Sequence, residues 1–477
     1  MGMSQLIKFV GAVLLLLNVS LSWSMAPPRP GEIKDLQSQG LLQERLDSAR
    51  TIGNHLLSGR SIDTLRWRIK RARGDTDISN TPPPAWANGL PSTGSPKILV
   101  LLVDFSDFPA DGSNTPSSVA ARMFTSQSAG SSSDPLYPYE SLRAFYQRSS
   151  YGALNIQGNV TAWYRAQHPR SYYSNLGQPN GNTALIDEAL TALEATGHNF
   201  AQYDNNGDGY IDNFHVKWTG PDTGWSSFWW AYQWSYFGSK VVSGVRPRNF
   251  IWSWIMNPAY TPGQTSYLPQ VDIHETGHAL GLPDYYDYDD TVGPDGGLGR
   301  LDMMDGNWGD HNTFSKMVLG WLTPTVVSTG SLNKSLAASG TSADAVLLMP
   351  GATSSTVFSE FFLAQYRKRG SGNDPANYPS DGISLWHIDS TLNAGGTDYQ
   401  FNNSLTSHKL IRLIQADGMA QIENQSALAD ANDFYVSGRT FGPSTNPSSA
   451  SYGGIATNAS LTAIGVAGGS SIAATFA

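Results

Sequence analysis

Two histidines four residues apart are the feature of this sequence best suited to chemistry. They lie in the stretch HETGHALGLPDYYD, residues 274–287, with Glu275 directly after the first histidine. One helical turn brings His274 and His278 onto the same face, so that both imidazoles can bind one zinc ion. Glu275 beside them can accept a proton from a metal-bound water. The spacing therefore predicts a zinc site, although HExxH alone fixes only three positions.

A catalytic zinc ion needs a third protein ligand and an open position for water. No glutamate occurs from residue 276 to residue 359, which argues against a glutamate ligand from a following helix. Gly281 can instead end the helix in a left-handed conformation and return a ligand three residues later. We predict Asp284 as that ligand, with Asp287 as the second choice.

A methionine under the metal commonly accompanies this arrangement. The segment GLGRLDMMDGNWGD, residues 297–310, follows about twenty residues on and has glycines on both sides of Met303 and Met304. We expect Met304 to form this methionine turn. The alternative is that both methionines only fill core space, as methionine often does.

The segment DNNGDGYID, residues 204–212, resembles a calcium loop. The predicted ligands match positions 1, 3, 5, 7 and 9 of such a loop and are Asp204, Asn206, Asp208, the Tyr210 carbonyl and Asp212. His215 replaces the glutamate of position 12, so a bound calcium ion needs a further ligand from elsewhere. The alternative is a polar turn between two elements.

The N-terminus has the layout of a secretory signal peptide, which we place at residues 1–24. Lys8 precedes an apolar run over residues 9–17, which is too short to span a bilayer, and small residues follow. No other stretch approaches membrane-spanning length, so we expect a secreted protein, extracellular or periplasmic. The chain has no cysteine, so its core or bound metals must hold it together.

The segment after the signal peptide is basic. Residues 27–75 hold 10 lysines and arginines against 6 acids, whereas residues 76–477 are acidic. This contrast predicts a propeptide over residues 25–80 that covers an acidic cleft, followed by a Pro/Gly/Ser linker at 81–96. Asp75, which follows a glycine, is a candidate latch on the zinc. A solvated helix is the alternative for residues 41–57. An acidic body disfavours nucleic acid as a partner.

The remaining sequence alternates strand-like and helix-like segments. Residues 97–105 are almost continuously apolar, as in a central strand, while 139–152 and 184–197 have helical spacing. Residues 210–218 read as another strand. Beyond Pro324 short apolar runs lie in Ser, Gly and Thr-rich sequence. We predict an α+β fold, with a catalytic domain at 97–325 and a mainly β region at 326–477, as a sandwich or an extension of the catalytic sheet.

These motifs together resemble the immune inhibitor A-type secreted metallopeptidases, within the metzincin-like zincins. The resemblance rests on KILVLLVDFSDFP, SLRAFYQRSSYGALNIQGNVTAWY, YDNNGDGYIDNF, HETGHALGLPDYYD, DMMDGNWGDHNTFSKMVLGWL, GISLWHID, IQADG and TNPSSASYGG. It implies a zincin-like twisted sheet with an active-site helix, zinc ligands His274, His278 and Asp284, and Glu275 as general base. The segment FLAQYRKR departs from it, because an acidic residue is expected before the arginine.

The sequence therefore predicts a monomeric zinc endopeptidase, made as a zymogen and acting on protein or peptide substrates, with calcium as a second cofactor. The alternative is a secreted calcium-dependent binding or adhesion protein whose zinc site is structural or inactive. The intact Glu275 argues against that alternative, since a structural site needs no base. The aromatic stretch at 224–238 could line a groove, but packing beneath the active-site helix is the commoner fate of such residues.

Overall fold

The computed structural model describes residues 27–29, 31–84, 89–126, 133–290, 297–350, 357–424 and 426–477. The predicted signal peptide and residues 85–88 of the predicted linker lie outside this set. Within it, none of the helices combines the length and the apolar character that a membrane crossing requires. Helices and several sheets are combined in the fold, which confirms the prediction of a mixed α and β protein.

The first sheet has five strands in the order β2-β1-β4-β7-β5. Four of them run parallel, and β5 pairs with β7 in the antiparallel direction at one edge. Their bounds are β1 Lys97–Asp104, β2 Gln157–Arg165, β4 Phe214–Trp218, β5 Tyr232–Ser235 and β7 Asn249–Trp254. The strand expected at 210–218 is two strands, because Tyr210–Ile211 (β3) pairs instead with Arg246–Pro247 (β6).

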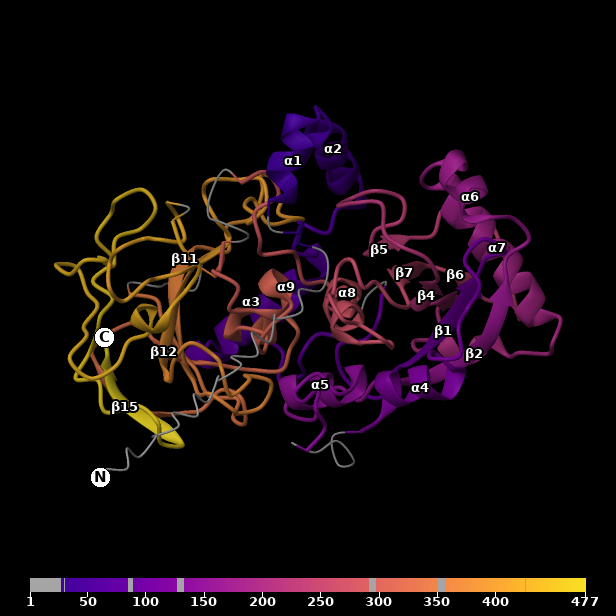
Figure 1. The fold of residues 1–477 in the computed structure, drawn as a ribbon. Helices are drawn as coiled ribbons and strands as arrows, with labels where there is room; N and C mark the ends of the chain where they lie inside the picture. The colour runs from indigo at the N-terminus through magenta and orange to yellow at the C-terminus, as the bar shows by residue number, and fades with distance from the viewer. Residues whose placement is uncertain are drawn as a thin grey trace, which may run out of the picture.

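Both faces of this sheet are covered, which explains the continuous apolar run of β1. Leu99, Leu101 and Val103 point into one core cluster, and the alternate residues point into another. Helices α4 (Pro116–Phe124), α5 (Leu142–Ser149) and α8 (Gln270–Leu280) pack on one side. Helices α6 (Arg170–Leu176) and α7 (Asn180–Glu194), with the short η2 (Phe200–Tyr203), pack on the other, as Figure 1 shows.

After residue 324 the chain forms two further sheets, which are separate from the first. One has the order β13-β12-β11-β10-β8, and the other has the order β14-β15-β9. The bounds are β8 Thr325–Val327, β9 Leu332–Ala337, β10 Val346–Leu348, β11 Glu360–Arg367, β12 Gly382–Asp389, β13 Ile411–Leu413, β14 Leu461–Thr462 and β15 Ser471–Phe476, with the 3-10 turn η3 at Ala431–Asp433. They are not an extension of the catalytic sheet.

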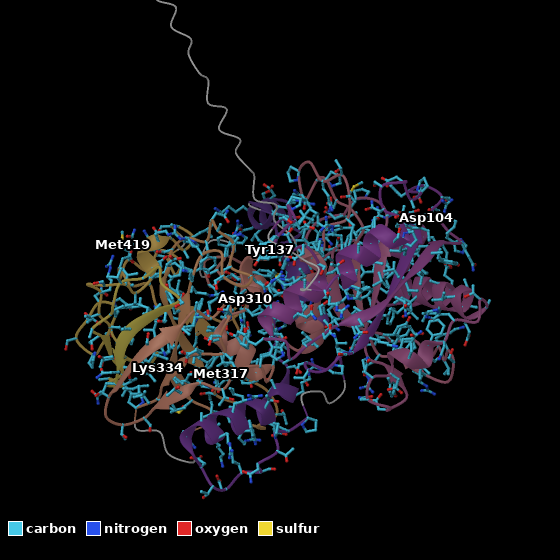
Figure 2. All side chains as sticks on the ribbon, turned by 90° about the horizontal axis from the view of Figure 1, so that it is seen from below. Asp104, Tyr137, Asp310, Met317, Lys334 and Met419 are labelled. Carbon is cyan, nitrogen blue, oxygen red and sulfur yellow. The ribbon has the colours of Figure 1, made fainter. Side chains whose placement is uncertain are left out.

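The two halves nevertheless share a core. Leu347 and Leu363 of the second sheet belong to the same buried cluster as Val100 of β1. Asp310 lies between the two halves, with Asp104 toward one end of the molecule and Lys334 toward the other (Figure 2). Helices α9 (Met303–Gly306) and α10 (Thr313–Val318) come from the segment that joins them.

The predicted propeptide, called the leader from here on, is folded onto the rest of the protein from residue 27 onward. It forms α1 (Glu32–Ser38), α2 (Leu42–Ile52), the turn η1 (Gly59–Ser61) and α3 (Ile62–Arg73). Helix α2 confirms the helical pattern seen at 41–57. Leu46 and Ala49 of α2 are buried in the cluster that contains Trp225 and Tyr288, whereas α3 packs against α10 and β8. In Figure 1 the pair α1 and α2 lies above α8.

Candidate metal centre

The predicted metal-binding residues lie on and just after α8. The helix begins after Pro269 and ends at Gly281, whose φ of 108° is in the left-handed region that glycine adopts without strain. The glycine reverses the chain, and the backbone N–H of Leu282 donates to the carbonyl of Gly277. This turn returns Asp284 toward the helix, as the spacing predicts.

Three side chains converge on one point. Nε2 of His274 lies 3.0 Å from Nε2 of His278 and 2.9 Å from Oδ1 of Asp284, and the same oxygen is 3.3 Å from His278 Nε2. All three side chains are buried. Zinc bonds of about 2.0–2.1 Å in tetrahedral geometry place neighbouring ligand atoms roughly 3.3 Å apart. The three residues therefore fit one zinc ion.

Hydrogen bonds from surrounding groups orient these ligands. Nδ1 of His274 donates to the carbonyl of Met303, and Nδ1 of His278 donates to the carbonyl of Leu282, each over 2.9 Å. A carbonyl only accepts, so both Nδ1 atoms carry hydrogen and both Nε2 atoms present lone pairs. The hydroxyl of Tyr288 donates to the outer oxygen of Asp284 over 2.5 Å.

Glu275 lies beside the cluster and is fully buried. Neither of its carboxylate oxygens accepts a hydrogen bond of normal geometry from the described residues. Burial raises its pKa to about 8, His278 opposes the rise, and Asp284 and Asp272 reinforce it. A buried carboxylate without a partner is costly unless a ligand or water supplies one, and such groups mark functional sites.

Met304 packs directly under the helix. A Cβ atom on Gly277 would lie 2.3 Å from its sulfur atom. The carbonyl of Met304 also accepts from the N–H of Tyr285, over 2.9 Å, which joins this turn to the residue after Asp284. Asp302 caps the turn through a 2.7 Å bond to the N–H of Met304. The methionine turn thus supports both the helix and the third candidate ligand.

The middle part of the chain resembles known peptidases. Residues 88–315 match the family model described as the catalytic domain of the immune inhibitor A peptidase M6. These residues, 228 of the 477 in the chain, are similar to that catalytic domain. The match contains β1, α8, the three clustered side chains and Met304, so the expected resemblance is confirmed.

Two relatives of the peptidase domain have names that agree with this match. Immune inhibitor A from Bacillus thuringiensis subsp. alesti is 27% identical over 234 residues, which are 41% of this chain and 34% of that protein. Pre-pro-metalloprotease PrtV from Vibrio cholerae serotype O1 (strain M66-2) is 27% identical over 230 residues, 40% of this chain and 25% of that protein. The chain thus covers 34% and 25% of the length of these relatives, and the findings support a metallopeptidase.

The leader lies against the candidate site of the peptidase domain. The carbonyl of Asn54 accepts from the N–H of Asp284 over 2.8 Å, and the N–H of Ser58 donates to the carbonyl of Gly281 over 3.0 Å. Arg60 donates to the carbonyl of Ala279 over 2.8 Å. A pocket of about 190 Å³ beside His278 has leader residues along one wall.

Asp75, predicted as the latch, is not part of this contact. It follows α3, its N–H donates to the carbonyl of Lys70, and its carboxylate pairs with Arg73 over 2.5 Å. Helix α3 carries the chain away from His278, because it packs on α10 and β8. The structure instead brings Asn54 and its neighbours to the metal centre, and sequence spacing alone gives no signal for this.

The other predicted ligands also have protein partners. Asp287 is buried, accepts from the N–H of Asp289 and lies 3.7 Å from Nζ of Lys409. Among the described residues, His274, His278 and Asp284 form the one group of three or more His, Asp or Glu side chains close enough together to share a metal ion. Asp287 is not a member of it.

The predicted calcium loop is closed by its own hydrogen bonds. Asp204 accepts from the backbone N–H groups of residues 207–209, and Asp208 accepts from Arg248 over 2.8 Å. Asn206 donates to Asp208, and Asp212 accepts from Asn205. Tyr210 starts β3. Calcium binding at this loop therefore stays a prediction.

Sequence reasoning missed a buried polar network beneath α8. Asp272, in the first turn of the helix, accepts from His215 and Ser253 at one oxygen and from Lys217 and Tyr267 at the other, over 2.6–3.0 Å. Burial raises the pKa of Asp272, but Lys217 and His215 outweigh it and hold the pKa below the usual range. This network ties the helix to β4 and β7, two residues before His274.

The aromatic stretch packs in the core rather than on the surface. Trp225, Trp229, Trp230, Tyr232 and Trp234 are all buried in the cluster between the first sheet and the leader. Phe228 and Tyr236 are partly buried against the same cluster, and Phe237 is 58% exposed. The stretch therefore forms much of the wall on which α2 rests.

Proposed function

We propose that this protein is a secreted zinc-dependent endopeptidase that is made as a latent precursor. His274, His278 and Asp284 hold the zinc ion, and Glu275 is the general base. The proposal rests mainly on one observation. Three buried ligand atoms converge beside a buried carboxylate whose oxygens lack normal hydrogen bonds. The family match of residues 88–315 supports the same chemistry.

Zinc bound in this cluster supplies Lewis-acid polarisation of the scissile carbonyl and lowers the pKa of a water molecule. The side chains of the protein do the rest. Glu275 accepts the proton of the attacking water and passes it to the leaving amine. The carbonyls of Met303 and Leu282 keep both imidazoles in the tautomer that presents Nε2. Tyr288 leaves Asp284 only one oxygen for the metal.

The edge strand β5 offers a binding surface for an extended substrate. It ends the first sheet, and Gln233 and Ser235 line the pocket beside His278. An extended peptide can add to such an edge through backbone hydrogen bonds, which do not depend on its side chains. In the described structure the leader lines the same pocket with Ile52, Gly53, Asn54, Leu56, Ser58 and Arg60.

Latency follows from that position of the leader. Its contacts with Asp284, Gly281 and Ala279 cover the side of α8 that a substrate must reach. Removal of the leader would expose His278 and β5 together. A signal peptide at residues 1–24 would deliver the precursor outside the cytoplasm. A processing protease can act there on the basic sequence RWRIKRARGD of the leader.

A cleavage assay tests the proposal. Processed protein, loaded with zinc, is incubated with a mixture of denatured proteins with and without a chelator. We expect cleavage that the chelator abolishes and added zinc restores. Chelator-insensitive cleavage, or none after complete processing and verified zinc binding, would refute the proposal.

The alternative reading, a binding protein with a structural zinc site, finds no support. Structural zinc sites are closed by four protein ligands, and they have no use for a base. The cluster in the described residues has three candidate ligands, with Glu275 next to them.

A further inference from the structure

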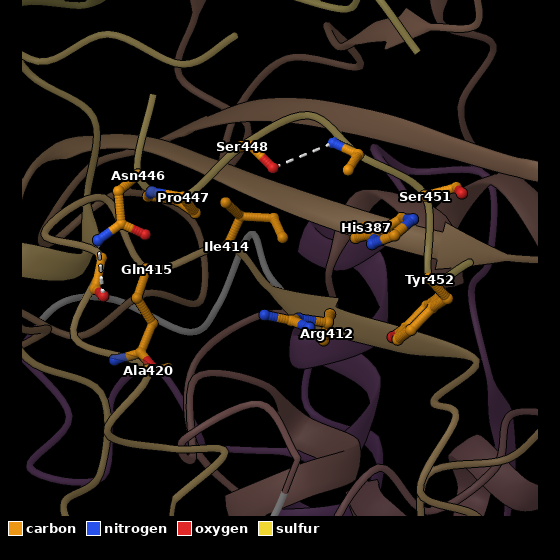
Figure 3. A pocket seen from close by; sticks show the side chains of 12 residues that line it. His387, Arg412, Ile414, Gln415, Ala420, Asn446, Pro447, Ser448, Ser451 and Tyr452 are labelled. Carbon is orange, nitrogen blue, oxygen red and sulfur yellow. Dashed lines mark hydrogen bonds between the residues drawn. The ribbon is translucent and has the colours of Figure 1, made fainter. Parts of the chain in front are cut away.

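A second polar pocket lies in the C-terminal half, away from α8. It has a volume of about 310 Å³ and is lined by residues of β12, β13 and the two loops 414–420 and 446–452. Figure 3 shows Arg412 between His387 and Tyr452 on one side and Gln415 and Asn446 on the other. The volume is at the lower end of the range typical of small-molecule sites, about 300–1,000 Å³.

One wall of this pocket is rigid. The ring of His387 is stacked between Phe362 and Tyr452, at centroid distances of 4.6 and 4.5 Å. Glu360 fixes two members of the stack, since one oxygen accepts from Nε2 of His387 over 2.9 Å and from the N–H of Tyr452 over 2.7 Å. His408 covers the other face of Tyr452, at 4.0 Å. The wall is therefore organised without a ligand.

Arg412 supplies a positive charge to this wall. It is the direct cross-strand neighbour of His387. Its nearest acid is Glu423, 3.7 Å from Nε and beyond hydrogen-bonding distance. The guanidinium has no hydrogen bond among the described residues. Its two terminal nitrogens can therefore take a carboxylate in the bidentate geometry for which arginine is suited.

The other polar groups of the pocket divide into occupied and available ones. Gln415 is occupied, because it donates to Asp433 and accepts from the N–H of Ile422. The hydroxyl oxygen of Ser448 accepts from the N–H of Ala450, so its hydrogen remains to be donated. Arg412 and this hydroxyl are therefore two donors that an anionic ligand can use.

We propose that this pocket is a binding site for a small carboxylate, of the size of a sugar acid or the last residues of a peptide. Arg412 binds the carboxylate, Ser448 donates to it, and the His387–Tyr452 stack bounds the rest of the ligand. The pocket shares no lining residue with the metal centre, whose candidate ligands are residues 274, 278 and 284.

Calorimetric titration of the full chain carrying Glu275→Gln tests the site with two matched pairs of probes. One pair is N-acetyl-dialanine and its C-terminal amide, and the other is glucuronate and glucose. We expect one or both acids to bind with a dissociation constant in the millimolar range or tighter, and the neutral partner of each to bind on the order of tenfold more weakly or not at all. Binding of the peptide acid identifies a peptide end as the source, and binding of glucuronate identifies a sugar acid.

Three variants separate this pocket from other anion sites. Arg412→Gln should weaken acid binding by roughly ten- to a hundredfold, and Arg412→Lys should weaken it less, because it keeps the charge but loses the fork. Ser448→Ala should weaken it severalfold without a change of charge. Arg369→Gln is the control, since Arg369 is half exposed and pairs with Asp381. Equal binding by Arg412→Gln and the parent, or no binding of either acid up to about 10 mM, would overturn the proposal.

Discussion

The sulfur atom of Met304 lies 2.3 Å from the position that a Cβ atom would take on Gly277. The turn that carries the methionine and the helix that carries the histidines thus touch where only a glycine fits. Met304 is fully buried, so it cannot move aside freely. The contact ties the position of His274 and His278 to the turn whose Met303 carbonyl holds His274.

Gly277→Ala should therefore destabilise the protein, although alanine is the better helix former by about 1 kcal/mol. Overpacking of a closed core costs about 1–3 kcal/mol, so we expect a lower melting temperature and weaker zinc retention. Combining it with Met304→Ala should restore part of the loss, because the smaller side chain makes room. Melting curves of the two single variants and the double variant measure the coupling. Strict additivity would show that the two residues do not compete for space.

Asp272 should be essential for stability. Asp272→Asn leaves Lys217 buried without a counter-charge, and loss of one partner of a buried pair costs about 3–5 kcal/mol. Replacing both residues, by Asp272→Leu with Lys217→Met, should cost less than the single change. Denaturant unfolding of the three variants measures this. A single variant as stable as the parent would show that the network does not hold α8 in place.

Asp272 should also make the free energy of unfolding depend on pH in the acid range. Lys217 and His215 lower the pKa of Asp272 in the fold, against the effect of burial. A lowered folded pKa gives stability that is present above the unfolded value of about 3.9 and lost as pH falls toward the folded one. The parent should therefore lose stability below about pH 4, and Asp272→Asn should show less of this loss. Parallel acid-unfolding curves would contradict the assignment.

The leader should loosen in mild acid. His55 is 7% exposed, and its ring packs on Tyr288 beside Asp284. Burial lowers its pKa from 6.5 to about 4, Asp284 opposes the shift, and Arg50 adds to it. Because the neutral form is favoured in the fold, its stabilisation is full above pH 6.5 and is lost as pH falls toward 4. The protection factors of the backbone amides of residues 53–60, which correct for slower chemical exchange in acid, should fall over this range, and His55→Gln should remove most of the fall. An unchanged pH profile in His55→Gln would exclude this residue as the cause.

Calcium should stabilise the fold through the loop at 204–212. Ligand that binds only the native state adds about 2.7 kcal/mol at a hundredfold excess over its dissociation constant. Asp208→Ala should reduce the rise in melting temperature on adding calcium, while Arg248→Gln, which removes only the pairing cation of Asp208, should keep it. Equal calcium responses in Asp208→Ala and the parent would mean that the loop is an ordinary polar turn.

The parts of this fold that local sequence specifies were predicted. The apolar run of β1, the four-residue spacing of His274 and His278 and the reversal at Gly281 each follow from short-range geometry. The pattern of apolar residues predicts that a segment is a strand, but not which sheet it joins or in which register. Both depend on partners that are distant in the sequence, so the separation of the first sheet from the C-terminal sheets was not predicted.

The long-range contacts of the site were not predictable for the same reason. In the sequence His215 stands only as a mismatch at position 12 of a calcium loop, yet in the structure it donates to Asp272, 57 residues away. The contact between Asn54 and Asp284 joins two segments with no shared motif. A glycine–aspartate pair predicts Asp75 as the latch, but Asp75 follows α3, which packs on α10 and β8, and its carboxylate pairs with Arg73. Such contacts follow from the packing of helices and sheets, about which a short motif carries no information.

If Asp284 rather than Asp287 is the third ligand, replacing the two residues should have very different effects on zinc content. Asp284→Ala should lose most of the zinc, because only two of the three ligands, the histidines, remain. Asp287→Ala should retain it, since Asp287 lies by Lys409 and outside the cluster. Metal analysis after dialysis measures both, with His278→Ala as the reference for full loss. Normal zinc content in Asp284→Ala would move the third ligand elsewhere.

The most direct test of the account is Glu275→Gln, measured for zinc content and peptide cleavage on the same processed sample. Glu275 is beside the cluster without being a member of it, so the variant should bind one zinc ion like the parent. Loss of the general base should lower cleavage by roughly a hundred- to ten-thousandfold. Full zinc content with cleavage near the detection limit is the predicted result. Cleavage at the parent's rate would contradict the account.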